Sequence, residues 1–306
     1  MAAAERYADQ VRTARVDLWA TSLPLMGWHA ARALIELEAG DPDGALASIS
    51  VLDANIHEFE HWPYLLWVKA LVRLSNRTPG LGIDELEGSL SANRGRVASR
   101  FGQATITAIR SDLLLATGHP ARARAMLAGV GDSAPTPLLL ARSRVDLADD
   151  ESARVSRRMR ALVGHRSVSI RERAEALLLQ AVADERLGVH EEARLTADRA
   201  IELTNRNGLR TPLLMVPRAD LVRVLSDHAL DGIPDPFGAA VTVVALTRRE
   251  RELLAGLSSG RRLDALAADQ HVSLNTVKTH LQNLYRKLGV RSRSDAIAVG
   301  RQRGLL

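Results

Sequence analysis

The sequence of 306 residues predicts an all-α protein, in which a helical repeat array is followed by a compact group of four short helices. Three observations support this fold class. Leu, Ala and Arg dominate the composition, and Ala and Leu are strong helix formers. Apolar residues recur at helical spacing, in units where a small turn residue is followed by alanine. The last part of the chain carries helix-capping pairs at short intervals.

Residues 1–230 contain recurring helical units. In three of them a glycine is followed five residues later by an alanine: Gly40 and Ala45, Gly118 and Ala123, Gly188 and Ala193. Ala148 and Ala153 mark a fourth, weaker copy, and a degenerate unit fits the gap near residues 74–90. Small residues permit the tight turns and close helix approach that a helical solenoid needs. The pattern resembles tetratricopeptide-like repeats without most of their aromatic residues; an irregular helical domain is the alternative.

The segment DGIPDPFG at residues 231–238 marks the clearest boundary in the chain. Its two prolines and two glycines cannot continue a helix. We therefore expect a helical repeat domain over 1–230, a linker over 231–244 and a C-terminal domain over 245–306. The residues VTVVAL at 241–246 are expected to form a short extended lead-in to that domain.

The first two helices of the C-terminal domain follow from local patterns. Thr247 and Glu250 form a capping-box pair that opens the first helix. This helix is expected to end between residues 256 and 260, where two glycines occur. Apolar residues within 263–267 then give a second, short helix one buried face.

The third and fourth helices have equally clear limits. Ser273 is a suitable cap for a third helix that runs to about Leu288, and Gly289 stops it. Ser292 and Asp295 form another capping pair at the start of the fourth helix.

The third predicted helix is amphipathic. At about 100° per residue, one side carries the apolar residues Leu274, Val277, Leu281, Leu284 and Leu288. The opposite side carries Lys278, Thr279, Gln282, Asn283 and Arg286. Amide and cationic side chains of this kind hydrogen-bond base edges and phosphates. A short helix, a tight turn and a longer helix with such a face predict a helix-turn-helix that docks in a major groove.

Charge is distributed unevenly along the chain. Residues 247–306 hold 12 Lys and Arg against 5 Asp and Glu, a net charge of +7, whereas the other 246 residues carry −2. A basic segment on a near-neutral body is the electrostatic footprint of a polyanion-binding module. A solvated, arginine-rich surface is the alternative interpretation.

Several short signatures in this segment occur together and in a fixed order. They are Leu246-Thr247 with Arg249-Glu250, Val272-Ser273, Thr276-Val277-Lys278-x-His280-Leu281, Lys287-Leu288-Gly289-Val290 and Ser292-Arg293-x-Asp295-Ala296-Ile297. This run closely resembles the LuxR-type helix-turn-helix family over nearly all of the last sixty residues. The resemblance implies that the third helix reads double-stranded DNA and that the fourth supports a homodimer. It also implies that base edges are read by Lys278, Thr279, Gln282 and Asn283.

The basic and hydroxyl residues around this helix are candidate phosphate contacts: Arg248, Arg249, Thr276, Arg286, Lys287, Arg291 and Arg293. The second helix departs from the family pattern. Arg262 replaces the usual small hydroxyl cap, Ala265 an acidic residue and Gln270 a large apolar one. These changes put DNA affinity in doubt more than fold.

The whole arrangement resembles the C-terminal half of the large ATP-binding LuxR-type regulators. No Gly-Lys pair occurs in the sequence, so we expect no phosphate-binding P-loop and no ATPase module. The repeat domain is expected to bind a small-molecule or protein effector, without a cofactor. The absence of cysteine, of an N-terminal signal-peptide pattern and of a long apolar run suggests a cytoplasmic regulator with no membrane segment. A repeat-based adaptor with a degenerate helix-turn-helix is the main alternative.

The stretch HEFEH at 57–61 matches the zinc-peptidase pattern H-E-x-x-H. Tyr64 and Trp67 occupy the places where the short-spacer form needs a glycine and a third histidine. Pro63 biases the preceding residue away from helical geometry. We therefore expect no metal site and no catalytic residues, and a zinc hydrolase is only a remote alternative.

Overall fold

The computed structural model describes residues 23–51, 62–94, 98–225, 230–238, 248–269, 273–288, 290 and 292–302. Within these ranges the protein has helices and no strands, which confirms the all-α fold class. The helices are α2 (Leu23–Ala39), α3 (Pro42–Ser50), α4 (Trp62–Ser75), α5 (Pro79–Ala92), α6 (Arg100–Ala116), α7 (Pro120–Leu127), α8 (Thr136–Ala148), α9 (Ser152–Val163), α10 (Ile170–Arg186), α11 (His190–Asn207), α12 (Thr211–Leu214), α13 (Arg218–Val224), α14 (Arg248–Ser258), α15 (Leu263–Asp269), α16 (Leu274–Leu288) and α17 (Arg293–Gln302).

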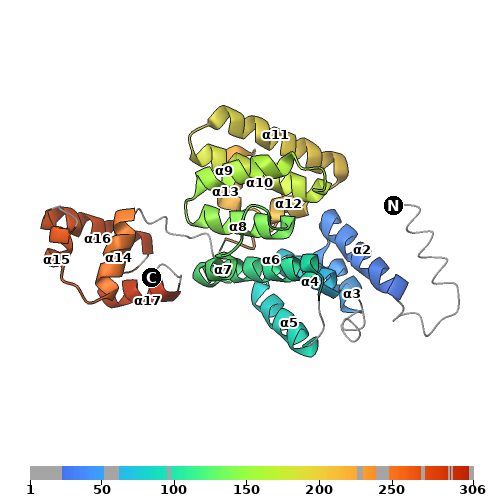
Figure 1. Ribbon diagram of the computed structural model, residues 1–306, viewed down its shortest axis with the longest axis horizontal. Coiled ribbons are helices and arrows are strands. Elements are labelled where there is room, and N and C mark those ends of the chain that lie inside the picture. Colours follow the sequence, from blue (N-terminus) through green and yellow to red (C-terminus); the bar gives the residue numbers. More distant parts are fainter. Residues whose placement is uncertain are drawn as a thin grey trace.

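Helices α2–α11 form five successive pairs, each joined by a tight turn (Figure 1). Every one of these turns contains a residue with a positive φ angle: Gly40 (81°), Arg77 (56°), Gly118 (80°), Asp150 (64°) and Gly188 (81°). Glycine adopts this conformation readily, whereas a residue with a side chain does so less favourably. The turn at Arg77 belongs to the pair α4–α5, which occupies the gap left between the first two glycine markers.

The residue five positions after each turn is buried in all five pairs, where the second helix approaches the first: Ala45, Gly82, Ala123, Val155 and Ala193. The predicted markers of the fourth unit are wrong by two positions. Its turn residue is Asp150 rather than Ala148, and Ala153 is exposed while Val155 is buried. Aspartate tolerates the left-handed conformation better than most residues do, so this turn needs no glycine to mark it.

The pairs stack on one another, and the first helix of each pair packs against the first helix of the next. The stack also returns to its own beginning, because α12 packs against α4 (Figure 1). Glu38, at the end of α2, accepts hydrogen bonds from the Thr211 backbone N–H (2.8 Å) and hydroxyl (2.6 Å). Arg171, at the start of α10, donates its Nη2 to the same carboxylate at 2.9 Å.

Three charged side chains are buried together between α6, α8 and α10. The Arg144 guanidinium donates to both oxygens of Asp112, at 2.8 and 2.6 Å, and also to Glu175. Burial raises the pKa of Asp112, and it raises the pKa of Glu175 to about 7 even though Arg144 opposes the shift. One guanidinium thus faces two carboxyl groups, and proton retention by Glu175 lowers the buried negative charge.

Part of the segment predicted as a linker packs onto the helical array. Ile233 and Phe237 are buried in the same hydrophobic core as the preceding helices. Nη1 of Arg218 donates to the carbonyl oxygens of Leu230 (3.0 Å) and Ile233 (3.1 Å), which holds this segment against α13. The expected extended stretch at 241–246 lies outside the described residues.

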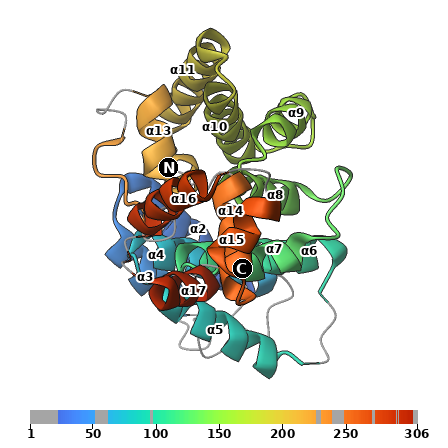
Figure 2. The ribbon, with the colours of Figure 1, turned by 90° about the vertical axis from the view of Figure 1, so that its left-hand side faces the viewer.

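Helices α14–α17 form a separate group, which Figure 1 shows to one side of α2–α13 and Figure 2 views from its own end. They have a hydrophobic core of their own, distinct from the larger one: Leu253, Leu254, Leu257, Leu266, Ala267, Val277, Leu284, Leu288 and Ala296. Among the described residues, no helix is long and apolar enough to cross a bilayer.

Candidate nucleic-acid interface

Helix α16 begins and ends where the sequence predicts. The Ser273 hydroxyl accepts a hydrogen bond from the Thr276 backbone N–H at 3.1 Å, and the two hydroxyls lie 2.9 Å apart. This serine cap satisfies one of the free N–H groups of the first turn. The helix then continues through 15 residues to Leu288.

One side of α16 is fixed in the small core. Val277, Leu284 and Leu288 are buried there, and Leu281 and Tyr285 pack against the cluster. The helix contacts α14 and α15 through this core. The side of α16 that faces the protein is therefore the predicted apolar stripe.

The described side chains on the opposite side of α16 are mostly exposed. Lys278, Thr279 and Gln282 are exposed, and Asn283 is half-buried. The Lys278 ammonium and the Gln282 amide are thus exposed to solvent, where a ligand can reach them. Contacts of these four residues with bases stay predictions.

The predicted phosphate contacts that the structure describes are distributed over the helices α14, α16 and α17. Arg248 and Arg249 lie in the first turn of α14, and Arg286 and Lys287 lie in the last turn of α16. Thr276, half-buried in the first turn of α16, shares the cap with the preceding serine. The predicted contact at residue 291 lies outside the described residues.

Arg293, another predicted phosphate contact, makes hydrogen bonds within the domain. Its Nη2 donates to the carbonyl oxygens of Leu257 (2.8 Å) and Arg261 (3.0 Å), so its guanidinium ties α17 to the C-terminal end of α14. A cation at this end also interacts favourably with the helix dipole. The sequence did not predict these two hydrogen bonds, because Arg293 is 32 positions from Arg261 and 36 positions from Leu257.

Helix α15 forms despite the departures from the family pattern. Arg262 precedes it and pairs weakly with Asp264 (Nε to Oδ1, 3.3 Å), and both side chains are exposed. Ala265 is exposed, so an acidic residue is not needed there for packing, while Leu266 is buried. Gln270 lies outside the described residues.

Gly256 has a packing role that the sequence did not reveal. A Cβ atom at this position would lie 2.2 Å from Cδ2 of Leu266, which is closer than van der Waals contact allows. The glycine is within α14 and lets α15 approach it closely. The sequence indicated only that this glycine lies near the end of the first helix of the domain.

A metal site finds no support in the described part of the chain, where no cluster of three or more His, Asp or Glu side chains could hold an ion. The HEFEH stretch itself lies outside the described residues. Trp62 follows it directly, begins α4 and is buried in the large core, and Trp67 packs against that core.

Comparison with known proteins identifies the C-terminal group of helices. Residues 244–299 match the family described as "Bacterial regulatory proteins, luxR family". Probable transcriptional regulatory protein NarL of Mycobacterium tuberculosis is 44% identical over 68 residues, which are 22% of this chain and 32% of NarL. Probable transcriptional regulatory protein SgaR of Hyphomicrobium methylovorum is 54% identical over 55 residues, 18% of this chain and 26% of SgaR.

HTH-type transcriptional regulator MalT of Cronobacter sakazakii is 44% identical over 57 residues, 19% of this chain and 6% of MalT. The chain therefore spans a third or less of the length of the curated relatives it matches. No solved structure matches the chain. The C-terminal part of the protein is thus a LuxR-family helix-turn-helix domain, the DNA-binding domain of transcriptional regulators.

Proposed function

We propose that the protein is a sequence-specific, non-enzymatic transcriptional regulator that acts in the cytoplasm as a homodimer on double-stranded DNA. A helical repeat domain over 1–230 senses an effector, and a linker over 231–244 joins it to the DNA-binding domain over 245–306. The observation that carries the proposal is the two-sided character of α16: one side is buried in the domain core, and Lys278, Thr279 and Gln282 on the other are exposed.

In this proposal α16 lies in the major groove. Lys278 offers a cation for guanine, and Gln282 and Asn283 offer amides whose paired donor and acceptor suit adenine. The net charge of +7 in residues 247–306 favours the phosphate backbone whatever the base sequence. Base contacts and phosphate contacts therefore have separable consequences.

A binding measurement on the full chain tests the proposal. Fluorescence anisotropy is recorded with a duplex selected from random DNA and with a scrambled duplex, each at two salt concentrations. We expect Gln282→Ala to lose about 1–3 kcal/mol on the selected duplex and little on the scrambled one. Arg291→Ala should weaken both duplexes about equally and lower the salt slope by about one unit.

Arg122→Ala is the matched control, because this exposed arginine lies on α7, outside the DNA-binding domain. It should leave both affinities unchanged. Equal losses on both duplexes from Gln282→Ala would contradict the assignment of the base-reading side. Failure of the wild-type protein to bind any duplex would favour the alternative function, a repeat-based adaptor with a degenerate helix-turn-helix. The altered second helix, in which Arg262 and Ala265 are exposed, is the reason to consider this alternative.

A further inference from the structure

Helix α9, the second helix of the fourth pair, is unusually basic. It carries four arginines and no Asp or Glu, and residues 152–170 as a whole hold five arginines and no acidic residue. Residues 1–246 together carry −2. Positive charge is thus concentrated on this helix and the loop after it, within an otherwise acidic part of the chain.

Three of these arginines share one face of α9, which we call the α9 basic face: Arg154, Arg157 and Arg160. They follow one another at three-residue intervals, so each lies about 60° around the helix from the last and about 4.5 Å further along it. Arg157 is exposed, and the side chains of Arg154 and Arg160 are 46% and 67% exposed. The three guanidinium groups can therefore reach a ligand together.

Arg158, the fourth arginine of the helix, does not belong to this face. It is buried and donates to Asp146 at 2.7 Å, to Asp132 at 3.1 Å and to the Ser143 hydroxyl at 3.2 Å. Its hydrogen-bonding capacity is used within the protein, where it joins α9 to α8.

The α9 basic face is only weakly neutralised by its own protein. Arg154 has a long ion pair with Glu151 and Arg160 has one with Asp184, each at 3.7 Å. Arg157 makes no ion pair within the described part of the chain. A separation of 3.7 Å is longer than a hydrogen bond, so N–H donors of all three side chains remain available to an anion.

The acidic residues nearest in sequence lie at one end of the helix. Asp150 and Glu151 are exposed just before α9 begins, and Glu151 is about 120° around the helix axis from Arg157. Beyond the opposite end of α9, Arg166 is exposed as well. The exposed surface consequently becomes more positive along the helix, away from these two carboxylates.

The other exposed residues of α9 are small. Ala153 and Ala161 lie between the arginines, and they line an open groove of about 600 Å³ together with Arg157, Arg160 and Leu187. No large apolar side chain of α9 itself, which the structure describes in full, is exposed. This composition is unsuited to an apolar protein partner, and it lets a charged ridge approach the helix closely.

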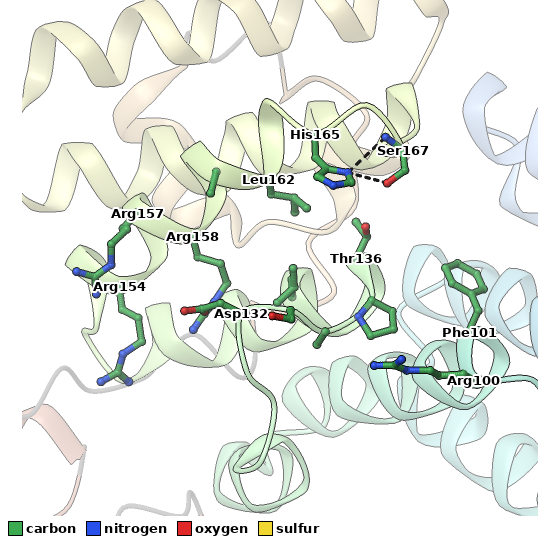
Figure 3. A pocket seen from close by; sticks show the side chains of 15 residues that line it. Arg100, Phe101, Asp132, Thr136, Arg154, Arg157, Arg158, Leu162, His165 and Ser167 are labelled. Carbon is green, nitrogen blue, oxygen red and sulfur yellow. Dashed lines mark hydrogen bonds and ion pairs between the residues drawn. The ribbon is translucent and has the colours of Figure 1, made fainter.

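The arginines of this face also border a cavity between the third and fourth helix pairs, on the far side of which lies Arg100. Figure 3 shows the guanidinium groups of Arg154 and Arg157 turned away from Arg100. Since both side chains are exposed, they face a ligand outside the array rather than one inside the cavity.

We propose that the α9 basic face binds the phosphate backbone of double-stranded DNA next to the site read by α16. Guanidinium groups bind phosphate oxygens through paired N–H donors, and such contacts do not depend on base sequence. The proposal rests on the proposed function and adds a second DNA contact, outside the LuxR-family domain.

The length of the chain between the two hydrophobic units permits this contact. Nine residues, 239–247, join the described end of the array to α14, and an extended chain of this length spans at most about 35 Å. DNA held by the C-terminal domain therefore stays close to the array. Tethering of this kind raises the effective concentration of DNA at the α9 basic face, so three weak contacts can add to the affinity.

Fluorescence anisotropy of the full chain with two duplexes tests the proposal. One duplex contains only the motif selected from random DNA, and the other adds about 20 base pairs on each side, or about 70 Å, which is twice the reach of residues 239–247. We expect these flanks to raise the affinity of the wild type at least tenfold at low salt. The triple variant R154Q/R157Q/R160Q should lose this gain, and its salt slope on the longer duplex should be lower by about two to three units.

The matched control is R122Q/R199Q/R206Q, which removes the same charge from exposed positions on α7 and α11. Glutamine and arginine have similar helix propensities, so both triple variants should unfold at the wild-type temperature in circular dichroism. The control should keep the gain from the flanks. An equal loss in the control, or an undiminished gain in R154Q/R157Q/R160Q, would overturn the proposal.

Failure of this proposal is distinguishable from failure of the proposed function. R154Q/R157Q/R160Q should select the wild-type motif, because α9 reads no bases, whereas Gln282→Ala should change the motif and keep the gain from the flanks. If the wild type selects no motif, the proposed function fails, and a scrambled duplex of the longer length still tests the α9 basic face. Equal salt slopes of the wild type and R154Q/R157Q/R160Q on that duplex would overturn the contact.

Polyglutamate is the probe for a different partner, an acidic protein. We expect R154Q/R157Q/R160Q to change DNA binding more than polyglutamate binding, because phosphates accept the paired donors of several guanidinium groups at once. Loss of polyglutamate binding in this variant, together with an undiminished gain from the DNA flanks, would overturn the DNA assignment in favour of an acidic protein.

Discussion

At the scale of single residues, the buried group formed by Asp112, Arg144 and Glu175 makes stability depend on pH. The pKa of Glu175 is raised from its ordinary value of 4.5 to about 7, chiefly by burial. Between these two values the native carboxyl keeps its proton while the unfolded one loses it. The unfolded state then binds fewer protons, so the free energy of unfolding falls as pH rises through this window.

We expect Glu175→Gln to remove this dependence, because a neutral amide hydrogen-bonds Arg144 without titrating. The shift corresponds to about 3 kcal/mol, which the variant should gain relative to the wild type between pH 4.5 and pH 8. Urea unfolding at a series of pH values measures this difference. Glu192→Gln, at an exposed position on α11, is the control and should give a profile parallel to the wild type. A parallel profile for Glu175→Gln would contradict the prediction.

At the scale of helices, the contact between α14 and α15 depends on a glycine. Gly256→Ala would place a methyl group against buried Leu266, and overpacking of this kind costs about 1–3 kcal/mol. The better helix propensity of alanine offsets about 1 kcal/mol of that loss. We expect net destabilisation, seen as faster amide hydrogen exchange in residues 248–269.

Gly88→Ala is the matched substitution with the opposite expected sign. Gly88 lies within α5, is exposed, and a Cβ atom there would meet nothing within 4 Å. Alanine should stabilise this helix by about 1 kcal/mol and slow its exchange. Slower exchange in both variants would show that α15 does not restrict the space at Gly256.

Local sequence patterns predicted the limits and the buried side of α16, but they did not predict all the contacts among the neighbouring helices. The cap at Ser273 and the apolar stripe depend on residues a few positions apart, so the sequence alone predicted both. The contact between Arg293 and the end of α14 joins distant positions, and no local pattern encodes it. The same holds for Gly256, whose role depends on where Leu266 lies in space.

At the scale of the whole molecule, the closure of the helical array depends on Glu38. Its carboxylate joins α2 to Arg171 and to Thr211, which are 133 and 173 residues away. Arg171 also lies over the Trp67 ring, with 5.4 Å between its guanidinium carbon and the ring centroid. Glu38 and Arg171 together thus link α2 and α4 to α10 and α12.

We expect Glu38→Ala to open the array and to destabilise it by about 3 kcal/mol, because Arg171 and the start of α12 lose a partner that is largely shielded from solvent. Small-angle X-ray scattering should then report a larger radius of gyration. Glu191→Ala, at an exposed position on α11, should leave the scattering unchanged. An unchanged radius and unfolding midpoint for Glu38→Ala would show that closure does not need this carboxylate.

The large-scale arrangement was only partly predictable from the sequence. A glycine at the turn revealed three of the helix pairs. The turns of the other two pairs are formed by Arg77 and Asp150, which look like ordinary polar residues in the sequence. The packing of Phe237 onto the first core was hidden by prolines and glycines typical of a linker. The cavity lined by Arg100, Arg154, Arg157 and Arg158 was not foreseen either, because its lining comes from three separate segments of the chain.

The central claim is that α16 reads a DNA sequence with its exposed side. Selection of bound sites from random DNA by the full chain tests it most directly, followed by the same selection with Gln282→Ala. We predict one enriched motif with two-fold symmetry for the wild type, and a motif that loses base preference at one position in each half-site for the variant. No enrichment by the wild type, or the same motif from both proteins, would contradict the claim.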